Sequence, residues 1–452
     1  MSARPHRRAL PEAAARRGWC PSLARPMPTG DGLLARVHPP LGVLTLAQAS
    51  AVAQGARLFG NGHLDLTARA NIQIRGVTEA TGAALSDRLA ATGLGDVRTD
   101  GGPQRLTLTS PLAGHDPDAW IDGPAVARAI EAAGRAIPGL PAKTLVAIAD
   151  HPGVAMPEAD CCLTARGLGA IAITLSAGVG QRDLGLCTEG EAPGRVGALL
   201  SAFVRTGRRR MRDLTEDELT AVVEAMPASG AAGIDISVRQ GGDGVSSTPA
   251  PFAPAAGLHA RPDLQILAIE APFGRCTADA LDRVVAAAET LGVDTIRLSP
   301  TRGMVLLAAP GAPAAAVLAD LAAAFVVATD DPRRHVDACT GAPGCASGST
   351  PTLADAARVA ELFRPLAARG HVAHVSGCAK GCARPGSADL TLIARAGLYG
   401  AVLGGAPSDE PRIHLPIEAV LDRLGRAKTV GLSAAFAPDI AQTGYGGDGR
   451  PV

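Results

Sequence analysis

The chain has 452 residues, enough for about two to four domains, and 47% of them are hydrophobic, which excludes wholesale disorder. Its 43 Lys and Arg residues balance 43 Asp and Glu residues, and aromatic residues make up only 2% of the chain. Proteins that bind nucleic acids carry a surplus of positive charge and, for single strands, aromatic stacking surfaces, so this class is excluded.

The N-terminal stretch is basic, but it lacks the apolar segment of a secretory signal. The most apolar stretch of the chain, residues 313–329, is rich in Ala and interrupted by Asp320, so it predicts a helix of a folded domain and no membrane span. We therefore expect a cytoplasmic protein. In that compartment clustered cysteines bind metals more often than they form disulfides, and nine cysteines are too few for a disulfide scaffold.

One pattern of residues occurs twice, at 33–77 and at 265–309. Each copy has an apolar strand, a turn that ends in glycine (Gly42 and Gly274), a helix, a short strand, an arginine-centred loop and another apolar strand. The two glycines are 232 residues apart, and the predicted helices 46–59 and 278–291 keep this offset. Chance similarity is the alternative, but a register kept over about 40 residues favours two related units with pseudo-twofold symmetry.

A longer α+β segment follows each copy. After the first copy, periodicity predicts helices at 123–139 and 194–210 and strands at 144–150 and 170–175. Residues 229–258 are rich in Gly, Ser and Pro and predict a linker. After the second copy, we expect a helix at 351–370 and strands at 371–376 and 388–395.

Four of the nine cysteines form two close pairs in glycine-rich loops, CTGAPGC with Cys339 and Cys345 and SGCAKGC with Cys378 and Cys382. Four thiolates can approach one centre only on a sharply turning backbone, which glycine permits. Structural zinc sites usually space their cysteines more closely than the first pair, so the pattern favours a [4Fe–4S] cluster. Structural zinc and unligated cysteines remain the alternatives.

These motifs resemble those of the sulfite and nitrite reductases. The cluster motif continues as SGC-x2-GC-x2-P with Pro385, and the repeated unit is similar to the ferredoxin-like half domain of those enzymes. The resemblance covers residues 20–430. Within the superfamily it is strongest to the precorrin-3B synthase family, and it is carried by CPSLARPMPTGDGLLARV (20–37), LTLTSPLAGHDP (106–117) and LPAK (140–143).

The resemblance implies an α+β fold with two ferredoxin-like half domains and two larger α+β lobes in a pseudo-twofold, nitrite/sulfite reductase-like architecture. The expected parts are a basic flexible tail (1–25), half domain 1 (26–95), a first α+β lobe that binds a tetrapyrrole (96–228), the linker (229–258), half domain 2 (259–329), an iron–sulfur cluster lobe (330–440) and a tail (441–452).

A tetrapyrrole substrate carries acetate and propionate carboxylates, which arginine and lysine bind through charge-assisted hydrogen bonds. The resemblance matches Arg69, Arg105 and Lys143 to the family's anion-binding positions, and Arg302 is taken as the pseudo-symmetric partner of Arg69. Asn71, Gln73 and Arg75 share one face if they lie on a strand. Taken singly, each charge would be an ordinary surface residue. The predicted substrate-binding set is Arg69, Asn71, Gln73, Arg75, Arg105, Lys143 and Arg302.

The resemblance implies a monooxygenase reaction of aerobic cobalamin biosynthesis. Precorrin-3A, dioxygen and reducing equivalents give precorrin-3B, which is hydroxylated at C20 and carries a γ-lactone. The cluster would supply electrons to a mononuclear non-haem iron, whose ligands the sequence does not identify. His115–Asp116 and the pair His371 and His374 are the nearest approach to a two-histidine, one-carboxylate set. No catalytic residue is assigned. Because no nucleotide-binding motif is present, we expect an external reductase or ferredoxin as electron donor.

Two other functions remain open. A sirohaem-dependent sulfite or nitrite reductase would use Cys382 to bridge the cluster and the haem iron. The reductases carry a second lysine two residues after the first, and Leu145 at that position argues against this function. A non-enzymatic iron–sulfur electron-transfer module would have no affinity for a tetrapyrrole, and it leaves the arginine set unexplained.

Overall fold

The computed structural model describes residues 19–178, 180–230 and 249–438. The expected C-terminal tail, most of the expected N-terminal tail and the central part of the expected linker lie outside these residues. The chain divides into two compact units. The N-terminal unit comprises residues 33–327 with the segment that ends at Met27, and the C-terminal unit comprises residues from 328 onward with Pro28–Gly32. Within the described ranges, no helix combines the length and apolarity that a bilayer span requires.

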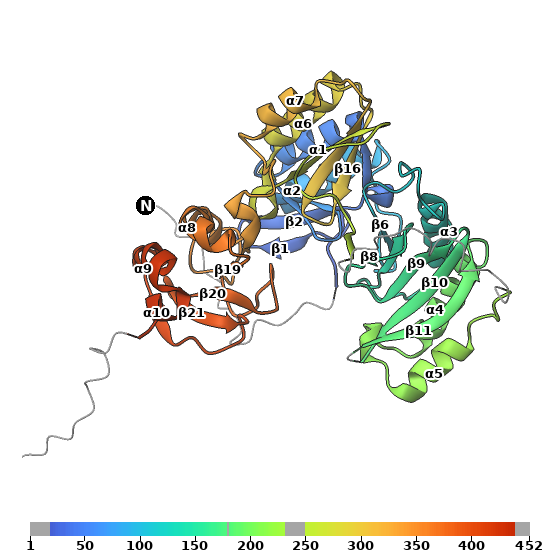
Figure 1. Ribbon diagram of the computed structural model, residues 1–452. Coiled ribbons are helices and arrows are strands. Elements are labelled where there is room, and N and C mark those ends of the chain that lie inside the picture. The colour runs from blue at the N-terminus through green and yellow to red at the C-terminus, as the bar shows by residue number, and fades with distance from the viewer. Residues whose placement is uncertain (1–18, 179, 231–248, 439–452) are drawn as a thin grey trace, which may run out of the picture. The chain divides into compact units, whose positions relative to one another are not determined.

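The first copy of the repeat forms an antiparallel sheet covered by two helices (Figure 1). Thr45 begins the first helix with a capping box, because its hydroxyl accepts from the N–H of Gln48 while the Gln48 side chain accepts from the N–H of Thr45. The elements are β1 (Met27–Thr29), β2 (Gly32–Val37), β3 (Val43–Thr45), α1 (Leu46–Phe59), β4 (His63–Leu66), β5 (Ile72–Val77) and α2 (Glu79–Ala90).

The second copy repeats this arrangement. Its helix also starts after a threonine, Thr277, whose hydroxyl accepts from the N–H of Ala280, but alanine cannot complete a capping box. The elements are β13 (Gly257–Ala260), β14 (Gln265–Glu270), β15 (Arg275–Thr277), α6 (Ala278–Thr290), β16 (Thr295–Ser299), β17 (Gly303–Ala308) and α7 (Ala314–Leu321). The expected pseudo-twofold repeat is confirmed.

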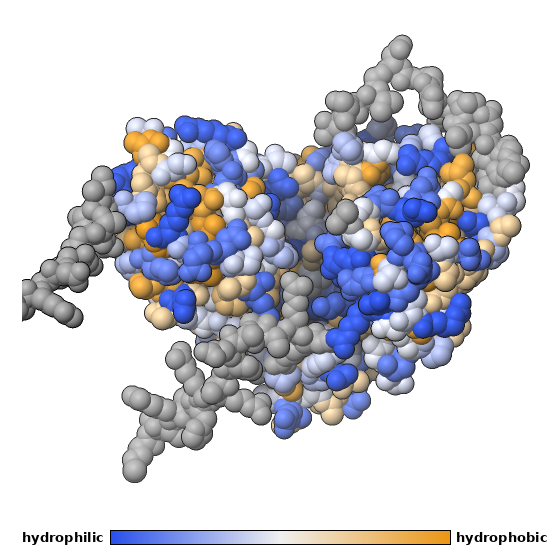
Figure 2. Space-filling view, turned by 90° about the horizontal axis from the view of Figure 1, so that it is seen from below, coloured by the Kyte–Doolittle hydropathy of each residue, from blue (hydrophilic) through white to orange (hydrophobic). Residues whose placement is uncertain are grey.

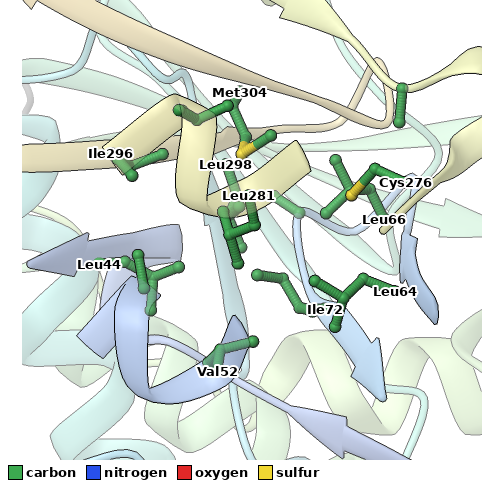
Figure 3. Close-up of a cluster of buried hydrophobic side chains, with 14 of the residues drawn as sticks. Leu44, Val52, Leu64, Leu66, Ile72, Cys276, Leu281, Ile296, Leu298 and Met304 are labelled. Carbon is green, nitrogen blue, oxygen red and sulfur yellow. The ribbon is translucent and has the colours of Figure 1, made fainter. Parts of the chain in front are cut away.

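Each copy gives one short strand to the sheet of the other copy. β15 pairs with β4, with Cys276 opposite Leu64, and β3 pairs with β16, with Leu44 opposite Ile296. The sheet orders are therefore β1-β2-β5-β4-β15 and β13-β14-β17-β16-β3. Since α1 also packs against α6, the two copies share one hydrophobic core, which Figure 3 shows from Leu44 and Val52 to Leu298 and Met304. The sequence pattern did not predict this exchange of strands.

The lobe between the two copies has its own sheet, in the order β11-β10-β9-β7-β6, and a separate core with α3 and α4. The predicted helices 123–139 and 194–210 are present but end earlier, at Arg135 and Arg205, before Pro138 and Gly207. The elements are β6 (Thr107–Thr109), α3 (Gly123–Arg135), β7 (Val146–Ala149), β8 (Val154–Ala155), β9 (Cys161–Gly167), β10 (Ala170–Ala177), β11 (Gly180–Thr188), α4 (Ala192–Arg205), α5 (Glu216–Glu224) and β12 (Ala250–Pro251).

The C-terminal unit contains a five-stranded sheet whose strands follow chain order, from β18 to β22. β18, β19 and β20 are parallel, whereas β21 is antiparallel to both of its neighbours, β20 and β22. Helix α8 connects β18 to β19 and packs against both strands. The elements are β18 (Val336–Ala338), α8 (Thr352–Ala367), β19 (Ala373–Ser376), β20 (Ala388–Arg395), β21 (Leu398–Gly405), β22 (Ile413–Leu415), α9 (Ile417–Val430) and α10 (Leu432–Ala435). The strand expected at 371–376 starts two residues later, which leaves His371 before it.

Large hydrophobic side chains reach the surface singly, as Leu58, Leu168 and Val430 do. On the face that Figure 2 presents, hydrophobic residues are interspersed with hydrophilic ones. The apolar cores are therefore covered mainly by mixed polar surface.

Candidate functional site

The cysteine loops of the C-terminal unit meet at one edge of its sheet. Cys339 directly follows β18, and Cys378 lies two residues after β19. Because β18 and β19 are adjacent and parallel, their carboxyl ends lie side by side. The N–H of Cys339 donates to the carbonyl of Val375 at 3.3 Å, and the N–H of Gly377 donates to Cys339 Sγ at 2.9 Å. The parallel strands thus bring the two cysteine pairs together.

Glycines keep these loops in close contact. A Cβ atom at Gly377 would lie 3.3 Å from Cys339 Sγ. Gly341 has a φ of +63°, and a Cβ there would lie 2.0 Å from the hydroxyl oxygen of Thr352. That hydroxyl, at the start of α8, donates to the carbonyl of Cys339 at 2.7 Å. Larger residues would push the loops apart, which explains the glycine-rich composition around the cysteines.

The four thiols lie within range of one another's charge. Desolvation by the surrounding loops raises the pKa of Cys382, although the residue is exposed, and the thiolates of Cys339, Cys378 and Cys345 raise it further. Burial, followed by Cys345 and Cys339, likewise raises the pKa of Cys378, although the N–H of Lys380 partly offsets this. Four thiolates can coexist in such a place only when bound cations compensate their charge.

A single ion and a cluster require different spacings of the four sulfur atoms. Among the described residues, no group of three or more His, Cys, Asp or Glu side chains is arranged to hold one metal ion. A tetrahedral zinc site needs all four sulfur atoms within about 2.3 Å of a single point. In a [4Fe–4S] cluster each thiolate binds a different iron, so the sulfur atoms are spaced more widely. The donor set of four thiolates is chemically suited to an iron–sulfur cluster.

The N-terminal unit contains a cavity of about 420 Å³ with strongly unbalanced charge. Five arginines line it, Arg25, Arg36, Arg69, Arg98 and Arg105, whereas Asp100 is the one carboxylate among the described lining residues. Asp100 is already paired with Arg98, whose Nη2 lies 2.5 Å from its Oδ2. The cavity therefore has an excess of positive charge that favours an anionic ligand.

Three of the predicted substrate-binding residues line this cavity, namely Arg69, Asn71 and Arg105. Arg69 Nη1 donates to the carbonyl of Lys143 at 3.0 Å, which fixes the guanidinium beside the LPAK segment. Asn71 is 6% exposed, and its Oδ1 has no hydrogen-bond partner among the described residues. A buried, unpartnered amide oxygen at a cavity wall is suited to accept a hydrogen bond from a ligand.

The other four predicted residues do not line the cavity. Gln73 and Arg75 share a face of β5 as expected, but Arg75 Nη1 lies 3.1 Å from Asp65 Oδ2, and Arg275 bonds the same carboxylate at 2.6 Å. The side chain of Lys143 is exposed.

The assignment of Arg302 as the partner of Arg69 is wrong. The 232-residue offset pairs Arg302 with Ala70, and both have positive φ angles, 61° and 50°. Arg69 corresponds to Thr301 instead.

Cys20, Arg36 and His38 are among the cavity residues that sequence reasoning missed. Burial, followed by the Arg36 and Arg105 charges, holds the pKa of His38 well below its usual value, so its ring is neutral at physiological pH. The signal that could have identified Arg36 is the alternation of β2, in which it is a charged residue between buried Ala35 and Val37. Leu145, at the position of the reductases' second lysine, is buried and also lines the cavity.

The histidines considered for a mononuclear iron lie in separate places. Asp116 Oδ2 is 2.8 Å from Nε2 of His151, and its Oδ1 accepts from Arg261 at 2.9 Å. His371 pairs with Asp389 at 3.2 Å on the surface, whereas His374 is fully buried in β19. These side chains do not combine into a three-ligand site within the described part of the chain.

Comparisons with known proteins identify the family. Residues 25–92 match the model of the nitrite/sulfite reductase ferredoxin-like half domain. A precorrin-3B synthase of Sinorhizobium sp is 33% identical over 441 residues, which cover 92% of this chain and 89% of that protein. The chain belongs to the precorrin-3B synthase family.

Two further similarities relate this member of the precorrin-3B synthase family to the reductases. A ferredoxin–nitrite reductase of Leptolyngbya laminosa is 30% identical over 114 residues, 25% of this chain and 22% of the reductase. The structure of the Mycobacterium tuberculosis NirA protein superposes with a TM-score of 0.63 at 21% identity and covers 87% of this chain and 80% of NirA. Together with the half-domain match, this confirms the expected nitrite/sulfite reductase-like α+β architecture.

Proposed function

We propose that this chain is a precorrin-3B synthase, which uses dioxygen to hydroxylate precorrin-3A at C20 and to form the ring A lactone in aerobic cobalamin biosynthesis. The observation that carries this proposal is the 33% identity to the Sinorhizobium precorrin-3B synthase over 92% of the chain. One atom of dioxygen enters the substrate and the other leaves as water, which consumes two electrons and two protons. The protein must therefore bind a polycarboxylate and receive electrons.

The cavity of the N-terminal unit is the proposed contact for the carboxylate rim of the tetrapyrrole. Its surplus of arginines and the unpartnered oxygen of Asn71 support this assignment. Guanidinium groups bind carboxylates through two parallel hydrogen bonds, which orient the ligand as well as attract it. The cavity is too small to enclose a tetrapyrrole, so it would receive one edge of the macrocycle with its acetate or propionate groups.

Cys339, Cys345, Cys378 and Cys382 are the proposed ligands of a [4Fe–4S] cluster, which when bound would pass electrons one at a time. The N–H of Gly377 would remain as a hydrogen-bond donor to the sulfur of Cys339 and so adjust the reduction potential. An external reductase or ferredoxin is the proposed source of the electrons. The described residues offer no three-ligand site for a mononuclear iron.

The cluster assignment is tested by replacing Cys378 with Ser in the full-length protein purified without oxygen. We expect loss of most of the iron and of the broad visible absorbance of the cluster. Cys187→Ser is the matched control, because Cys187 is a buried thiol of the N-terminal unit and its pKa is raised by burial to about 11. Equal iron content in both variants would contradict the assignment.

A sirohaem-dependent reductase is the second candidate function. The match to the half-domain model and the NirA-like fold are compatible with this function as well as with the synthase function. The apolar Leu145 at the cavity argues against it, because reduction of a bound oxyanion benefits from a cation there.

An optical spectrum of the anaerobically purified protein decides between the two. Intense haem bands indicate the reductase, whereas a broad shoulder alone indicates the cluster without haem. Addition of precorrin-3A, oxygen and a reducing system that supplies the two electrons, such as a ferredoxin with its reductase and NADPH, should then yield precorrin-3B. If no product forms while the cluster stays intact, the synthase function is refuted.

A further inference from the structure

Arg105 uses its hydrogen-bonding capacity on the backbone. Its Nη1 donates to the carbonyl of Pro39 at 3.1 Å and to that of Ala70 at 3.0 Å, and its Nη2 donates to the carbonyl of Arg69. Three of the five N–H groups of a guanidinium are therefore occupied. The carbonyls belong to two separate turns of the first repeat copy, whereas Arg105 belongs to the following lobe. This arginine joins the two turns and leaves little for a ligand.

Gly42 makes room for this contact. Its φ is +74°, and a Cβ atom there would lie 3.2 Å from Arg105 Nη1. The equivalent glycine of the second copy, Gly274, lies against the side chain of Arg302, because a Cβ atom on that glycine would lie 2.8 Å from the arginine Cδ. Both copies thus place an arginine side chain over the same turn. This recurrence in the second copy, away from the cavity, points to a structural function of the contact.

Arg36 is held in a different way. It lies opposite Gln73 in the pairing of β2 with β5. When the Gln73 amide is oriented with its oxygen toward the guanidinium, this oxygen accepts from Arg36 Nη2 at 2.6 Å and from Nε at 3.0 Å. The amide is neutral, so it orients Arg36 without cancelling its charge. Arg75 follows Gln73 by two residues on β5. It faces the carboxylate of Asp65, which cancels the charge of Arg75.

Arg36 and Arg69 line the same cavity. Burial lowers the pKa of Arg36, and the Arg69 guanidinium lowers it further, although the Cys20 thiol, which accepts a hydrogen bond from Arg36, partly offsets this. Two neutral polar atoms of the same cavity, Nδ1 of His38 and Oδ1 of Asn71, are buried with no hydrogen-bond partner among the described residues. Two neighbouring cations and two unpartnered polar atoms favour a ligand that is anionic and also forms hydrogen bonds.

We propose that Arg36, oriented by Gln73, acts with Arg69 to bind one carboxylate of the ligand, and that Arg105 fixes the turns beside them without binding the ligand. The proposal rests on the proposed function and specifies it, since the ligand class is an acetate or propionate side chain of a tetrapyrrole. It assigns the recognition of this carboxylate to a residue outside the predicted set, and it gives Gln73 a positioning function although Gln73 does not line the cavity.

The experiment measures binding of two stable porphyrins to the full-length protein by fluorescence titration. Uroporphyrin III carries eight carboxylates, whereas octaethylporphyrin carries none. We expect Arg36→Gln to weaken uroporphyrin binding by about 10- to 100-fold, the loss that a charge-assisted hydrogen-bonded pair produces. Octaethylporphyrin binding and the melting temperature should change little. Arg135→Gln, an exposed arginine at the end of α3, is the matched control and should leave both affinities unchanged.

Two further variants separate orientation from structure. Gln73→Glu places a carboxylate behind Arg36, as Asp65 does for Arg75, and should weaken uroporphyrin binding nearly as much as Arg36→Gln while the protein stays folded. Arg105→Gln should lower the melting temperature, because buried carbonyls lose their donors. Any folded Arg105→Gln protein should retain uroporphyrin affinity within about threefold, a change of under 1 kcal/mol.

The outcomes distinguish the proposal from the function on which it rests. If wild-type protein binds uroporphyrin and Arg36→Gln binds it equally well, the proposal is overturned while the tetrapyrrole function stands. The proposal is likewise overturned, and the tetrapyrrole function likewise stands, if Arg105→Gln loses affinity for uroporphyrin while its melting temperature is unchanged. If wild-type protein binds neither porphyrin, the tetrapyrrole function itself is refuted and the proposal with it.

Discussion

The exchange of strands between the two repeat copies predicts that Leu44→Ala destabilises the whole N-terminal unit. Leu44 belongs to the first copy, but β3 lies in the sheet of the second copy, where Leu44 is opposite Ile296. Its side chain is fully buried in the shared core, in the region that Figure 3 shows. Truncation therefore opens a cavity at the junction of both copies.

The magnitude follows from the burial. A Leu→Ala change at a fully buried site costs about 2–5 kcal/mol, because the transfer free energy of the removed atoms and the residual cavity add. In a unit of this size 1 kcal/mol lowers the melting temperature by roughly 2 °C, so we expect a shift of roughly 4–10 °C. The control is Leu58→Ala, the same change on α1 at a side chain that is 62% exposed, where the free energy of unfolding should change by less than about 0.5 kcal/mol.

Thermal unfolding of the full-length protein, followed by circular dichroism, measures both variants. Limited proteolysis of Leu44→Ala should in addition expose sites in both copies at once, since each copy lacks a complete sheet without the other. If Leu44→Ala melts like Leu58→Ala, or if cleavage is confined to the first copy, the exchange of strands does not exist in solution.

Two further predictions concern buried titratable groups. Burial, followed by Arg36 and Arg105, lowers the pKa of His38, so the unfolded chain binds a proton below about pH 6.5 that the folded chain does not bind, and stability falls by up to about 1.4 kcal/mol per pH unit below that value. His38→Gln should flatten this dependence, measured as the melting temperature between about pH 7.5 and about pH 5.5, and an unchanged slope would contradict the assignment. In the C-terminal unit, Tyr399 donates to Asp355 Oδ2 at 2.6 Å, and both residues are buried. Tyr399→Phe should cost about 1–3 kcal/mol in chemical unfolding, and a smaller loss would show that water replaces the hydroxyl.

The repeat was predictable from the sequence, but the strand exchange was not. The offset of 232 residues is visible because Gly42 and Gly274, with positive φ angles of 74° and 80°, must end the same turn in both copies. Which sheet the next three residues join depends on pairing partners more distant in the chain. β3 and β15 are only three residues long, with one buried residue each, so periodicity does not distinguish exchange from local pairing.

The wrong assignment of Arg302 arose because residues were matched by type and not by backbone conformation. Matching by residue type pairs it with Arg69, because both are arginines in equivalent loops. The backbone pairs it with Ala70, since these two residues occupy the left-handed position of the loop. Side-chain identity at a turn is therefore a weaker guide to equivalence than backbone conformation, which a single sequence does not report.

The cysteine loops were the most predictable part of the site, and their function as cluster ligands stays a prediction. Glycine-rich loops at the ends of two strands joined by a helix place both pairs at one sheet edge, since a strand–helix–strand unit makes its strands parallel. The sequence predicted the helix and the second strand, but not the short β18 that precedes the first pair. No comparable rule applies to the arginines, because their partners come from other strands and lobes.

Three arginines illustrate how partners decide function. Arg75 faces Asp65, Arg105 faces three backbone carbonyls, and Arg36 faces the neutral Gln73. All three are charged side chains near one another in the fold, and the first two belonged to the predicted substrate-binding set. A carboxylate cancels the charge, carbonyls occupy the donors, and an amide orients the group while its charge persists. The availability of an arginine to a ligand is thus determined by the groups that its guanidinium faces in the fold, and this explains why motif position alone selected Arg105 and passed over Arg36.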